Sequence, residues 1–526
     1  MLICATAGAQ SKSFNLAKWM QTQTAILQEL NRSYVDSLPV ERMQKAGIDA
    51  MLGTLDPYTI WVPEEEHEDF ELMISHTYGG IGAIIWKPEK DGPVIINEPY
   101  EGSPAAQAGL RCGDEIYTID GAPAAGLTAT EASSKMKGKP GTKVTFQVKR
   151  VYTGAMEEIT ITRRKIRLPN VEYAGILEDG KTGYVLLSGF TEGAAGEVRS
   201  AVKDLDSKGM KELVLDLRGN GGGVLQEAVE IVGLFVPKGT LVVSSKGNGL
   251  VKDDEYRTFS EPIAADLPLV VMVDSGSASA SEIVAGALQD CDRATIMGTR
   301  TFGKGLVQSV RPMPFGGQLK VTTAKYYIPS GRCVQAIDYS HRNEDGSVGH
   351  IPDSLTHEFK TAHGRTVRDG GGITPDVEIK GHEYSRIAYA LSLSGVLEHY
   401  TIEYCRAHES IAPVKDYHFD DYEGFIKFAL TQEFDARTSA MASYDRMVEE
   451  LRKDGLEESF SEELKALKAK LDFDKESFLR LKKDEIVPLI EREIAARYYF
   501  IPGSVELSLR YDDALKKALT SPRISY

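Results

Sequence analysis

Two stretches of the chain hold the residue types that acyl transfer to a serine would need. The run from Asp274 to Ile283, DSGSASASEI, places four serines directly after the apolar segment 269–273. The later run from Thr301 to Gly305, TFGKG, holds Lys304 between two glycines. A serine hydroxyl needs a neighbouring base to take its proton, and a desolvated lysine amine can be that base. The two stretches together therefore indicate a serine hydrolase with a lysine base.

The elements that must position these residues are a strand and a helix. Segment 269–273, LVVMV, is apolar and β-branched, which is typical of a buried parallel strand. Apolar residues on one helical face follow the serines, namely Ile283, Val284, Ala287 and Leu288. The serines thus lie at a strand-to-helix turn, where free backbone amides can stabilise an oxyanion. Serines before a helix are also ordinary N-caps, and a lysine in a glycine turn is normally solvated, so these two interpretations stay open.

The order and spacing of these motifs resemble a known family, the carboxyl-terminal processing, or tail-specific, serine peptidases. The resemblance depends on SASE at 279–282, FGKG at 302–305 and Gln308, and Lys304 follows Ser279 by 25 positions. It implies that Ser279 is the nucleophile, that Lys304 is its general base and that Gln308 orients the lysine amine. Only the family's register separates Ser279 from its neighbours, which are Ser275, Ser277 and Ser281.

A glycine-rich run, RGNGGG at 218–223, follows a second apolar segment, 213–217. Glycines after a strand are also typical of dinucleotide sites, but Val224 replaces the third glycine of that fingerprint, which argues against a nucleotide. The resemblance implies an oxyanion hole made by the amides of Gly223 and Ala280, each worth about 3 to 4 kcal/mol in the transition state.

Three charged residues near these turns receive structural roles. Asp216 and Arg218 flank the start of the glycine run, and we expect them to form an ion pair that supports the turn. Glu282 follows Ser279 by three positions and is expected to be a helix-start carboxylate stabilised by the helix dipole. None of the three is expected to be catalytic.

A separate part of the chain resembles a PDZ domain of the bacterial protease type. A glycine-rich turn and strand at 78–85, strands at 113–121 and 144–148, and helices at 102–106 and 128–137 are expected. A phosphate loop is excluded because a strand rather than a helix follows the glycines. Such domains bind a peptide as an added strand and receive its terminal carboxylate on backbone amides. The resemblance implies a cradle and apolar walls formed by Gly80, Ile81, Gly82, Ile84, Ala132 and Met136.

The pattern along the chain predicts five regions. We expect a signal remnant or disordered tail at 1–13, a helical region at 14–76, the PDZ domain at 77–165, the peptidase core at 166–380 and a helical region at 381–526. Strand and helix alternate in the core, which predicts an α/β fold with parallel strands, and the resemblance implies a crotonase-like α/β core.

Two segments raise further expectations. The two N-terminal helices should pack as a small helical layer, since their apolar residues recur at helical spacing. Residues 329–372 form a long polar insertion, and lengths of this kind usually mean a functional or mobile loop. Whether this insertion covers the active cleft stays open.

Composition excludes several classes of function. The chain has 526 residues, a net charge of −16 and a pI near 5.3, which argue against nucleic-acid binding. Its ten histidines are scattered and form no zinc motif, and its five cysteines are widely spaced, which argues against a disulfide framework. No stretch approaches the roughly 18 to 20 apolar residues of a membrane span. No metal or organic cofactor is expected.

The family resemblance therefore implies a periplasmic or otherwise exported serine endopeptidase. Its PDZ domain would recognise the free C-termini of protein or peptide substrates, and a Ser-Lys dyad assisted by Gln308 would cleave them. A homodimer through the terminal helices is a further expectation. Two alternatives remain, a non-catalytic peptide- or ligand-binding protein of the same fold and a PDZ scaffold.

Overall fold

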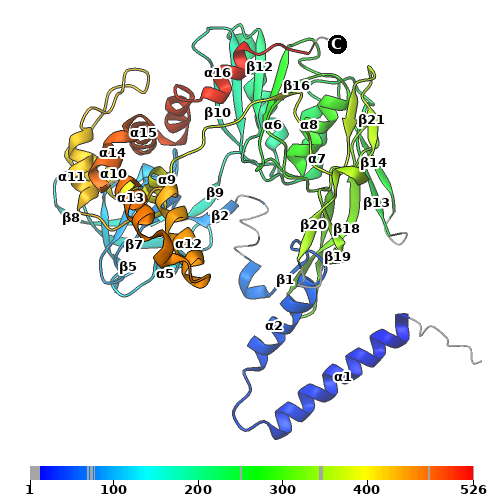
Figure 1. Cartoon of the computed structure of the whole chain (residues 1–526), viewed down its shortest axis with the longest axis horizontal. Coiled ribbons are helices and arrows are strands. Elements are labelled where there is room, and N and C mark those ends of the chain that lie inside the picture. Colours follow the sequence, from blue (N-terminus) through cyan, green and yellow to red (C-terminus); the bar gives the residue numbers. More distant parts are fainter. Residues whose placement is uncertain are drawn as a thin grey trace, which may run out of the picture. The chain divides into compact units, whose positions relative to one another are not determined.

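The chain folds into two units, shown in the computed structural model of Figure 1. The structure describes residues 12–67, 70, 75, 77–248, 252–342, 347–471 and 474–524. Most of the expected signal remnant, residues 1–11, lies outside the described residues. The first unit comprises the chain up to Glu64 together with Gln308–Thr322, and the second comprises Glu65–Val307 and Thr323–Tyr526.

The first unit is a pair of helices followed by a short strand. It contains α1 (Lys12–Ser33), α2 (Val40–Gly53) and β1 (Ile60–Val62), and a 3-10 turn, η1 (Glu64–Glu66), begins at its end. Strand β1 pairs antiparallel with residues 318–320, the beginning of β18 (Gln318–Tyr327), and β17 (Leu306–Pro312) also pairs with β18.

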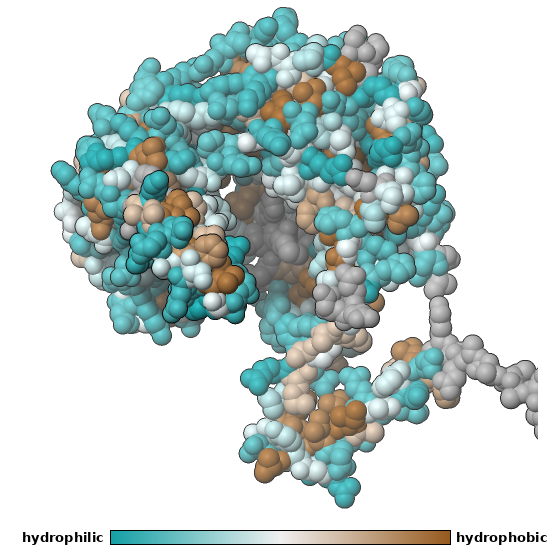
Figure 2. All heavy atoms as spheres, in the orientation of Figure 1, coloured by the Kyte–Doolittle hydropathy of each residue, from teal (hydrophilic) through white to brown (hydrophobic). Residues whose placement is uncertain are grey.

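The expected packing of α1 and α2 into a helical layer is wrong for the single chain. The side chains of Leu16, Trp19 and Met20 on α1 are 61% to 65% exposed, and Met51 on α2 is 61% exposed. Figure 2 shows this hydrophobic surface on the two helices. The helical spacing predicted the helices correctly, but spacing alone does not supply a surface to cover the apolar stripe.

The PDZ-like part of the second unit is built on a six-stranded antiparallel sheet. Its order is β3 (Ala83–Trp86), β4 (Val94–Pro99), β5 (Glu115–Ile119), β7 (Lys143–Lys149) and β8 (Met156–Thr162), with β6 (Ala122–Pro123) beside β5. Helices α4 (Pro104–Gln107) and α5 (Ala129–Met136) accompany it, and β2 (Thr77–Gly80) pairs with β9 (Arg164–Arg167). Helix α5 begins with a capping box between Thr128 and Glu131. Strand β3 lies at the edge of this sheet.

The core of the second unit is a six-stranded sheet in the order β10-β11-β12-β15-β16-β23. The strands are β10 (Val171–Ile176), β11 (Thr182–Leu187), β12 (Glu212–Asp216), β15 (Leu269–Val273), β16 (Thr295–Gly298) and β23 (Val377–Glu378). They are parallel except for β10, which runs antiparallel to β11. The predicted α/β core is therefore confirmed.

Helices cover both faces of this sheet because its strands are apolar on both sides. Helices α6 (Ala194–Ser207), α7 (Leu225–Val232) and α8 (Ala280–Asp290) pack on the face that carries Leu213 and Leu215. The face that carries Val214 packs against α16 (Asp513–Thr520) through Leu515. Alternate residues of one strand thus belong to two clusters, as expected for a strand buried on both faces.

The described residues of the long insertion, 329–372, include regular secondary structure. It contains two short hairpins, β19 (Ile337–Arg342) with β20 (Val348–His350) and β21 (Glu358–Lys360) with β22 (Thr366–Arg368), and a 3-10 turn, η2 (Asp353–Leu355). A second, antiparallel sheet pairs β13 (Leu241–Gly247) with β14 (Asp254–Arg257) and with residues 324–327 of β18.

The C-terminal region is helical and has its own apolar core. It contains α9 (Arg386–Leu393), α10 (Val396–Ala407), α11 (Tyr422–Leu430), α12 (Ser439–Lys453), η3 (Glu457–Phe460), α13 (Ser461–Leu471), α14 (Lys475–Leu481), α15 (Lys483–Leu509) and α16. Helix α15 is interrupted at Phe500, where φ is +57°. No described helix is both long and apolar enough to cross a membrane.

Candidate active site

Ser279 stands on a sharp turn between β15 and α8. Its φ of +54° and ψ of −110° lie in a region that residues other than glycine rarely adopt. Strain of this kind persists only where the surrounding structure enforces it, and it concentrates at functional sites. The strand, the strained serine and the helix follow the geometry of a nucleophile elbow, which presents the serine hydroxyl at a helix N-terminus.

The neighbouring serines differ from Ser279 in their burial and hydrogen bonds. Ser277 and Ser281 are fully buried, and their hydroxyls donate to the carbonyls of Leu217 and Asn220, each over 2.8 Å. Ser275 is exposed, whereas Ser279 is half-buried. Two of the three rivals that the sequence left open are therefore used in holding the turn together.

The fully buried carboxylate of Glu282 joins the serine turn to the lysine turn. Its Oε2 accepts from the amides of both Ser279, over 2.9 Å, and Lys304, over 2.8 Å. Its Oε1 accepts from the amide of Gly303, over 2.7 Å, and from the hydroxyl of Thr301, over 2.6 Å. The backbones of the proposed nucleophile and base thus lie one hydrogen bond from the same oxygen. The sequence interpretation placed Glu282 at the helix start but missed that it links the serine turn to the lysine turn. The Ser-x-x-Glu spacing, which is typical of a capping box, was the one local signal for its bond to the Ser279 amide.

The ionisation of Glu282 is set by two opposing effects. Burial raises its pKa to about 7, while the four donors around it favour the charged form. Only the ionised carboxylate can accept from all four donors, because a proton on either oxygen would face an N–H or O–H group.

The insertion holds the lysine turn from its other side. The Gly305 amide donates to the Gln335 side chain over 2.7 Å, and the Ala336 amide donates to the Gly303 carbonyl over 2.9 Å. A Cβ at Gly303 would lie 2.3 Å from the Cβ of Ala336, so this position requires glycine. The half-buried Lys304 is therefore presented by a turn that is fixed on both sides.

The glycine-rich run lies against the start of α8. A Cβ at Gly222 would lie 2.8 Å from the Ala280 nitrogen and 2.6 Å from the Ala278 carbonyl oxygen. Buried Asn220 holds the run in place, since its side chain accepts from the Gly222 amide over 2.9 Å and donates to Leu187 over 2.7 Å.

The two amides expected to form the oxyanion hole come from these adjoining segments. Gly223 has a φ of +155° and forms a β-bridge with Phe190, and Ala280 is the first residue of α8. Within the part of the chain that the structure describes, neither the Gly223 nor the Ala280 amide has a hydrogen-bond acceptor. Both are therefore available to a bound carbonyl oxygen.

The expected ion pair of Asp216 and Arg218 is confirmed and extends further than predicted. The Arg218 Nε donates to both Asp216 oxygens over 2.9 and 3.0 Å, and its Nη2 donates to Asp512 over 2.6 Å. The Tyr184 hydroxyl also donates to Asp216, over 2.6 Å, and burial raises the pKa of this phenol. Asp512 caps α16, so the ion pair joins the glycine turn to the C-terminal helices.

Gln308 lies in β17, in the first unit, whereas Ser279 and Lys304 lie in the second. Its side-chain amide donates to the Thr322 hydroxyl over 3.2 Å. This bond stabilises the β17–β18 pairing.

A pocket of about 240 Å³ lies between β3 and α5 in the PDZ-like part. Three of the six residues expected there line it, namely Ile81, Gly82 and Met136. Ile84 is instead 38% exposed, Ala132 is buried in the core of the sheet, and Gly80 ends β2. The remaining lining residues, which the sequence did not indicate, are Tyr78, Ala83, Ile85, Tyr100, Ser133, Lys137 and Leu168.

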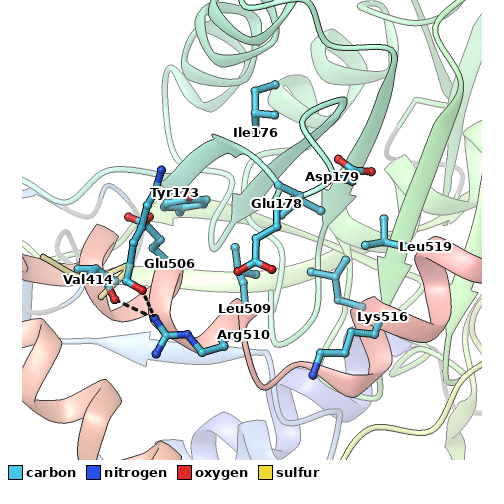
Figure 3. Close-up of a pocket in the computed structure, with 13 residues that line it drawn as sticks. Tyr173, Ile176, Glu178, Asp179, Val414, Glu506, Leu509, Arg510, Lys516 and Leu519 are labelled. Carbon is cyan, nitrogen blue, oxygen red and sulfur yellow. Dashed lines mark hydrogen bonds between the residues drawn. The ribbon is translucent and has the colours of Figure 1, made fainter. Parts of the chain in front are cut away.

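A second pocket, about 580 Å³ in volume, contains none of the proposed catalytic residues. It lies between the β10–β11 hairpin and helices α15 and α16, as Figure 3 shows. Its Arg510 is held by the carbonyls of Val414 and Tyr417, over 2.8 and 2.9 Å, and is therefore structural. Across the described ranges, no group of three or more His, Cys, Asp or Glu side chains could hold a metal ion.

Comparisons with known proteins give three matched stretches and several relatives. The family described as "Peptidase family S41" matches residues 181–340, "PDZ domain" matches 95–150, and "Probable PDZ-protease, C-terminal helical domain" matches 387–521. The chain is 34% identical over 344 residues to the "Carboxy-terminal-processing protease" of Bartonella bacilliformis, a match that covers 64% of this chain and 77% of the relative.

Two further proteins are similar over part of their length. Identity is 37% over 311 residues to the "Probable CtpA-like serine protease" of Staphylococcus aureus, which covers 58% of this chain and 60% of that one. Among solved structures, the "Photosystem II D1 C-terminal processing protease" is 26% identical, with 70% of this chain and 89% of that chain covered and a TM-score of 0.37.

Proposed function

The chain belongs to peptidase family S41, and from that membership we propose that it is a serine endopeptidase with Ser279 as nucleophile and Lys304 as general base. The observation that carries this assignment is the carboxylate of Glu282, which accepts from the amides of both residues. Because one buried carboxylate is hydrogen-bonded to both turns, it fixes the position of the nucleophile's backbone relative to that of the base. Catalysis by proximity requires such fixed positions.

The proposed reaction follows from the groups around Ser279. The neutral amine of Lys304 takes the hydroxyl proton, and the Ser279 oxygen attacks the carbonyl carbon of the substrate. The amides of Gly223 and Ala280 donate to the oxyanion, and Lys304 returns its proton to the leaving amine. Water, deprotonated by Lys304, then attacks the acyl-enzyme and releases the second product. The proposed assistance by Gln308 depends on the family resemblance, in which this residue follows Lys304 by four positions.

Cleavage of an unstructured protein substrate tests the dyad. We expect the wild type and Ser275→Ala to cut, since Ser275 is exposed and outside the proposed chemistry, and we expect Ser279→Ala and Lys304→Ala to be inactive. Lys304→Arg should also be inactive, because a guanidinium keeps its proton. Cutting by Ser279→Ala would remove Ser279 as the nucleophile. Cutting by Lys304→Arg would remove the amine as the base. Failure of the wild type itself to cut would favour the alternative, a non-catalytic binding protein.

We also propose that the pocket between β3 and α5 receives the C-terminal residues of substrates. Strand β3 is an edge strand and can accept an added strand, and Ser133, Met136 and Lys137 line the groove beside it. Lysine supplies a positive charge that suits a terminal carboxylate.

A matched pair of variants on α5 tests this second proposal. Ser133→Phe fills the pocket and should weaken binding of a tail peptide to the full chain at least tenfold, whereas Ser134→Phe, on the exposed side of the helix, should not. Amidation of the peptide's C-terminus should weaken binding to a similar degree. Equal binding by both variants would contradict the proposed groove.

Two further expectations remain proposals. The exposed apolar side chains of α1 and α2 support a homodimer through these helices, and sedimentation showing a monomer at micromolar concentration would contradict it. Export to the periplasm is tested by cell fractionation, where recovery in the cytoplasm alone would contradict it.

A further inference from the structure

Two buried cysteines from distant parts of the chain meet where the PDZ-like part contacts the C-terminal helices. Cys112 lies in the turn before β5, and Cys405 lies in the last turn of α10. Both are free thiols, 4% and 1% exposed, and they are in hydrogen-bond contact with each other. They pack in one apolar cluster with Ile95 and Ile402.

The contact between the two thiols is held in place by interactions around it. Arg406 on α10 forms an ion pair of 2.6 Å with Glu115 on β5, and Asn97 on β4 donates to Glu398 on α10. The rings of Trp86 and His399 lie 5.2 Å apart on the same boundary. A non-covalent interface thus holds the two cysteines in one buried cluster at this boundary.

A buried guanidinium faces the pair. The side chain of Arg497 on α15 is 2% exposed, and its charge lies next to both sulfurs. Its Nη1 is held by Glu493, but among the described residues its Nε and Nη2 have no hydrogen-bond partner. The hydrogen bond from Cys112, together with the Arg497 charge and the Tyr498 hydroxyl, lowers the pKa of Cys405. A buried cation beside a thiol favours the thiolate, which is the reactive form.

A pocket leads to the two thiols. Its volume is about 450 Å³, and Cys112, Cys405, Arg111 and Arg497 are among its lining residues. This space can admit a small disulfide-containing molecule next to the sulfurs, and the two arginines suit the carboxylates that such molecules carry.

We propose that Cys112 and Cys405 form a reversible disulfide that covalently joins the PDZ-like part to the C-terminal helices, with a small-molecule disulfide as the oxidant. The Cys405 thiolate attacks one sulfur of the incoming disulfide, whose S–S bond breaks and whose other half leaves as a thiol after taking up a proton. The Cys112 sulfur, after losing its proton to solvent, attacks the mixed disulfide at Cys405 and displaces the second thiol. Two protein thiols are oxidised, and one small disulfide is reduced to two thiols.

Equilibration of the reduced full-length chain with mixtures of reduced and oxidised glutathione tests the proposal. Peptide mapping of the trapped protein should show a Cys112–Cys405 cross-linked peptide that disappears on reduction. Cys291→Ser should retain this peptide, because Cys291 lies at the end of α8 and outside the cluster. Cys112→Ser should instead accumulate glutathione at Cys405. The oxidised wild type should unfold at a higher temperature than the reduced form, since the bond closes a very long loop.

The role of Arg497 gives a second measurement that does not require a cysteine variant. Arg497→Met should slow disulfide formation at neutral pH by about tenfold, and Arg497→Lys should restore most of the rate, because a retained charge stabilises the thiolate. A folded wild type that shows no Cys112–Cys405 peptide at any glutathione ratio would overturn the proposal. Pairing of either cysteine with Cys291 or Cys333 instead would also overturn it.

Discussion

The replacement Glu282→Gln separates the charge of this side chain from its shape. The carboxylate accepts four hydrogen bonds, two on each oxygen. Glutamine keeps one oxygen, and its NH₂ group turns toward two donors that can no longer be paired. Each unpaired buried donor costs about 1 to 3 kcal/mol, so the two together cost about 2 to 6 kcal/mol. If this cost falls on the alignment of Ser279 with Lys304, kcat/KM should decrease between about 30-fold and about 25,000-fold.

The pH dependence distinguishes this role from a general loss of stability. Burial raises the pKa of Glu282 to about 7, above the value of 4.5 for the free side chain. Activity of the wild type should therefore rise with pH through about 7, as the ionised form that holds both turns becomes populated. Because the folded-state pKa is the higher one, the contribution of Glu282 to stability is greatest below pH 4.5 and falls by about 3 kcal/mol as pH rises to 7. Activity and stability should thus change in opposite directions between pH 5 and 7.

Initial rates and chemical unfolding, each measured from pH 5 to pH 9, provide the assay. Glu282→Gln should lose both the rise in activity near pH 7 and the fall in stability. A matched control is Glu197→Gln, because the Glu197 carboxylate also accepts four hydrogen bonds, from Arg167, from the Val171 amide and from both the backbone and the side chain of Asn170. It should lower stability and leave the shape of the activity profile unchanged. A Glu282→Gln profile that overlays the wild-type profile after scaling would refute the reasoning.

Three further substitutions probe the packing around the site. Gly222→Ala should lower kcat at least about 100-fold with little change in KM, because its Cβ would push against the Ala280 amide. The control Gly221→Ala should keep a near-normal rate, because a Cβ at Gly221 meets no atom within 4 Å. Equal rates for the two variants would contradict the oxyanion assignment. Arg332→Met should lower the free energy of unfolding, measured by denaturant titration, by about 3 to 5 kcal/mol, because it leaves the buried Asp290 charge unpaired. The double variant Arg332→Met, Asp290→Leu should recover most of that loss. Tyr326→Phe removes a buried hydroxyl that donates to the Ser279 carbonyl over 3.2 Å. It should lower the free energy of unfolding by only about 0.5 to 1.5 kcal/mol and the rate less than tenfold, because the Ile283 amide still donates to that carbonyl.

The elements around the serine could be predicted because their signals are local. Strand β15 is a continuous apolar run, and the helical spacing after Ser279 gave α8, so the strand-to-helix turn followed directly. Strand β14, with the sequence DEYR, carries no such signal, because its residues are mostly exposed and polar. The antiparallel direction of β10 could not be predicted either. The direction of a strand depends on the connection between it and its neighbour, not on the residues of the strand itself.

The contacts that connect the site could not be predicted because they join residues far apart in the sequence. Glu282 was recognised as a helix-start residue, but its bonds to Thr301, Gly303 and Lys304 exist only after the sheet has formed. The same holds for Asp512, which reaches Arg218 from the other end of the chain. Spacing along a chain reports which residues share an element, whereas the neighbours of a buried carboxylate are decided by tertiary packing.

The lysine turn shows how the insertion enters the site without supplying a catalytic group. A Cβ at Gly303 would collide with Ala336, and a Cβ at Gly305 would lie 2.8 Å from the Gln335 nitrogen and 3.1 Å from the Cys333 sulfur. The two glycines of the motif are thus required by the first residues of the insertion, as well as by the turn itself. Since Glu282 holds the same turn from the opposite side, neither the insertion nor α8 can shift without moving the Lys304 backbone. The placement of the proposed base is therefore decided by two segments that flank it in space and that the FGKG motif does not contain.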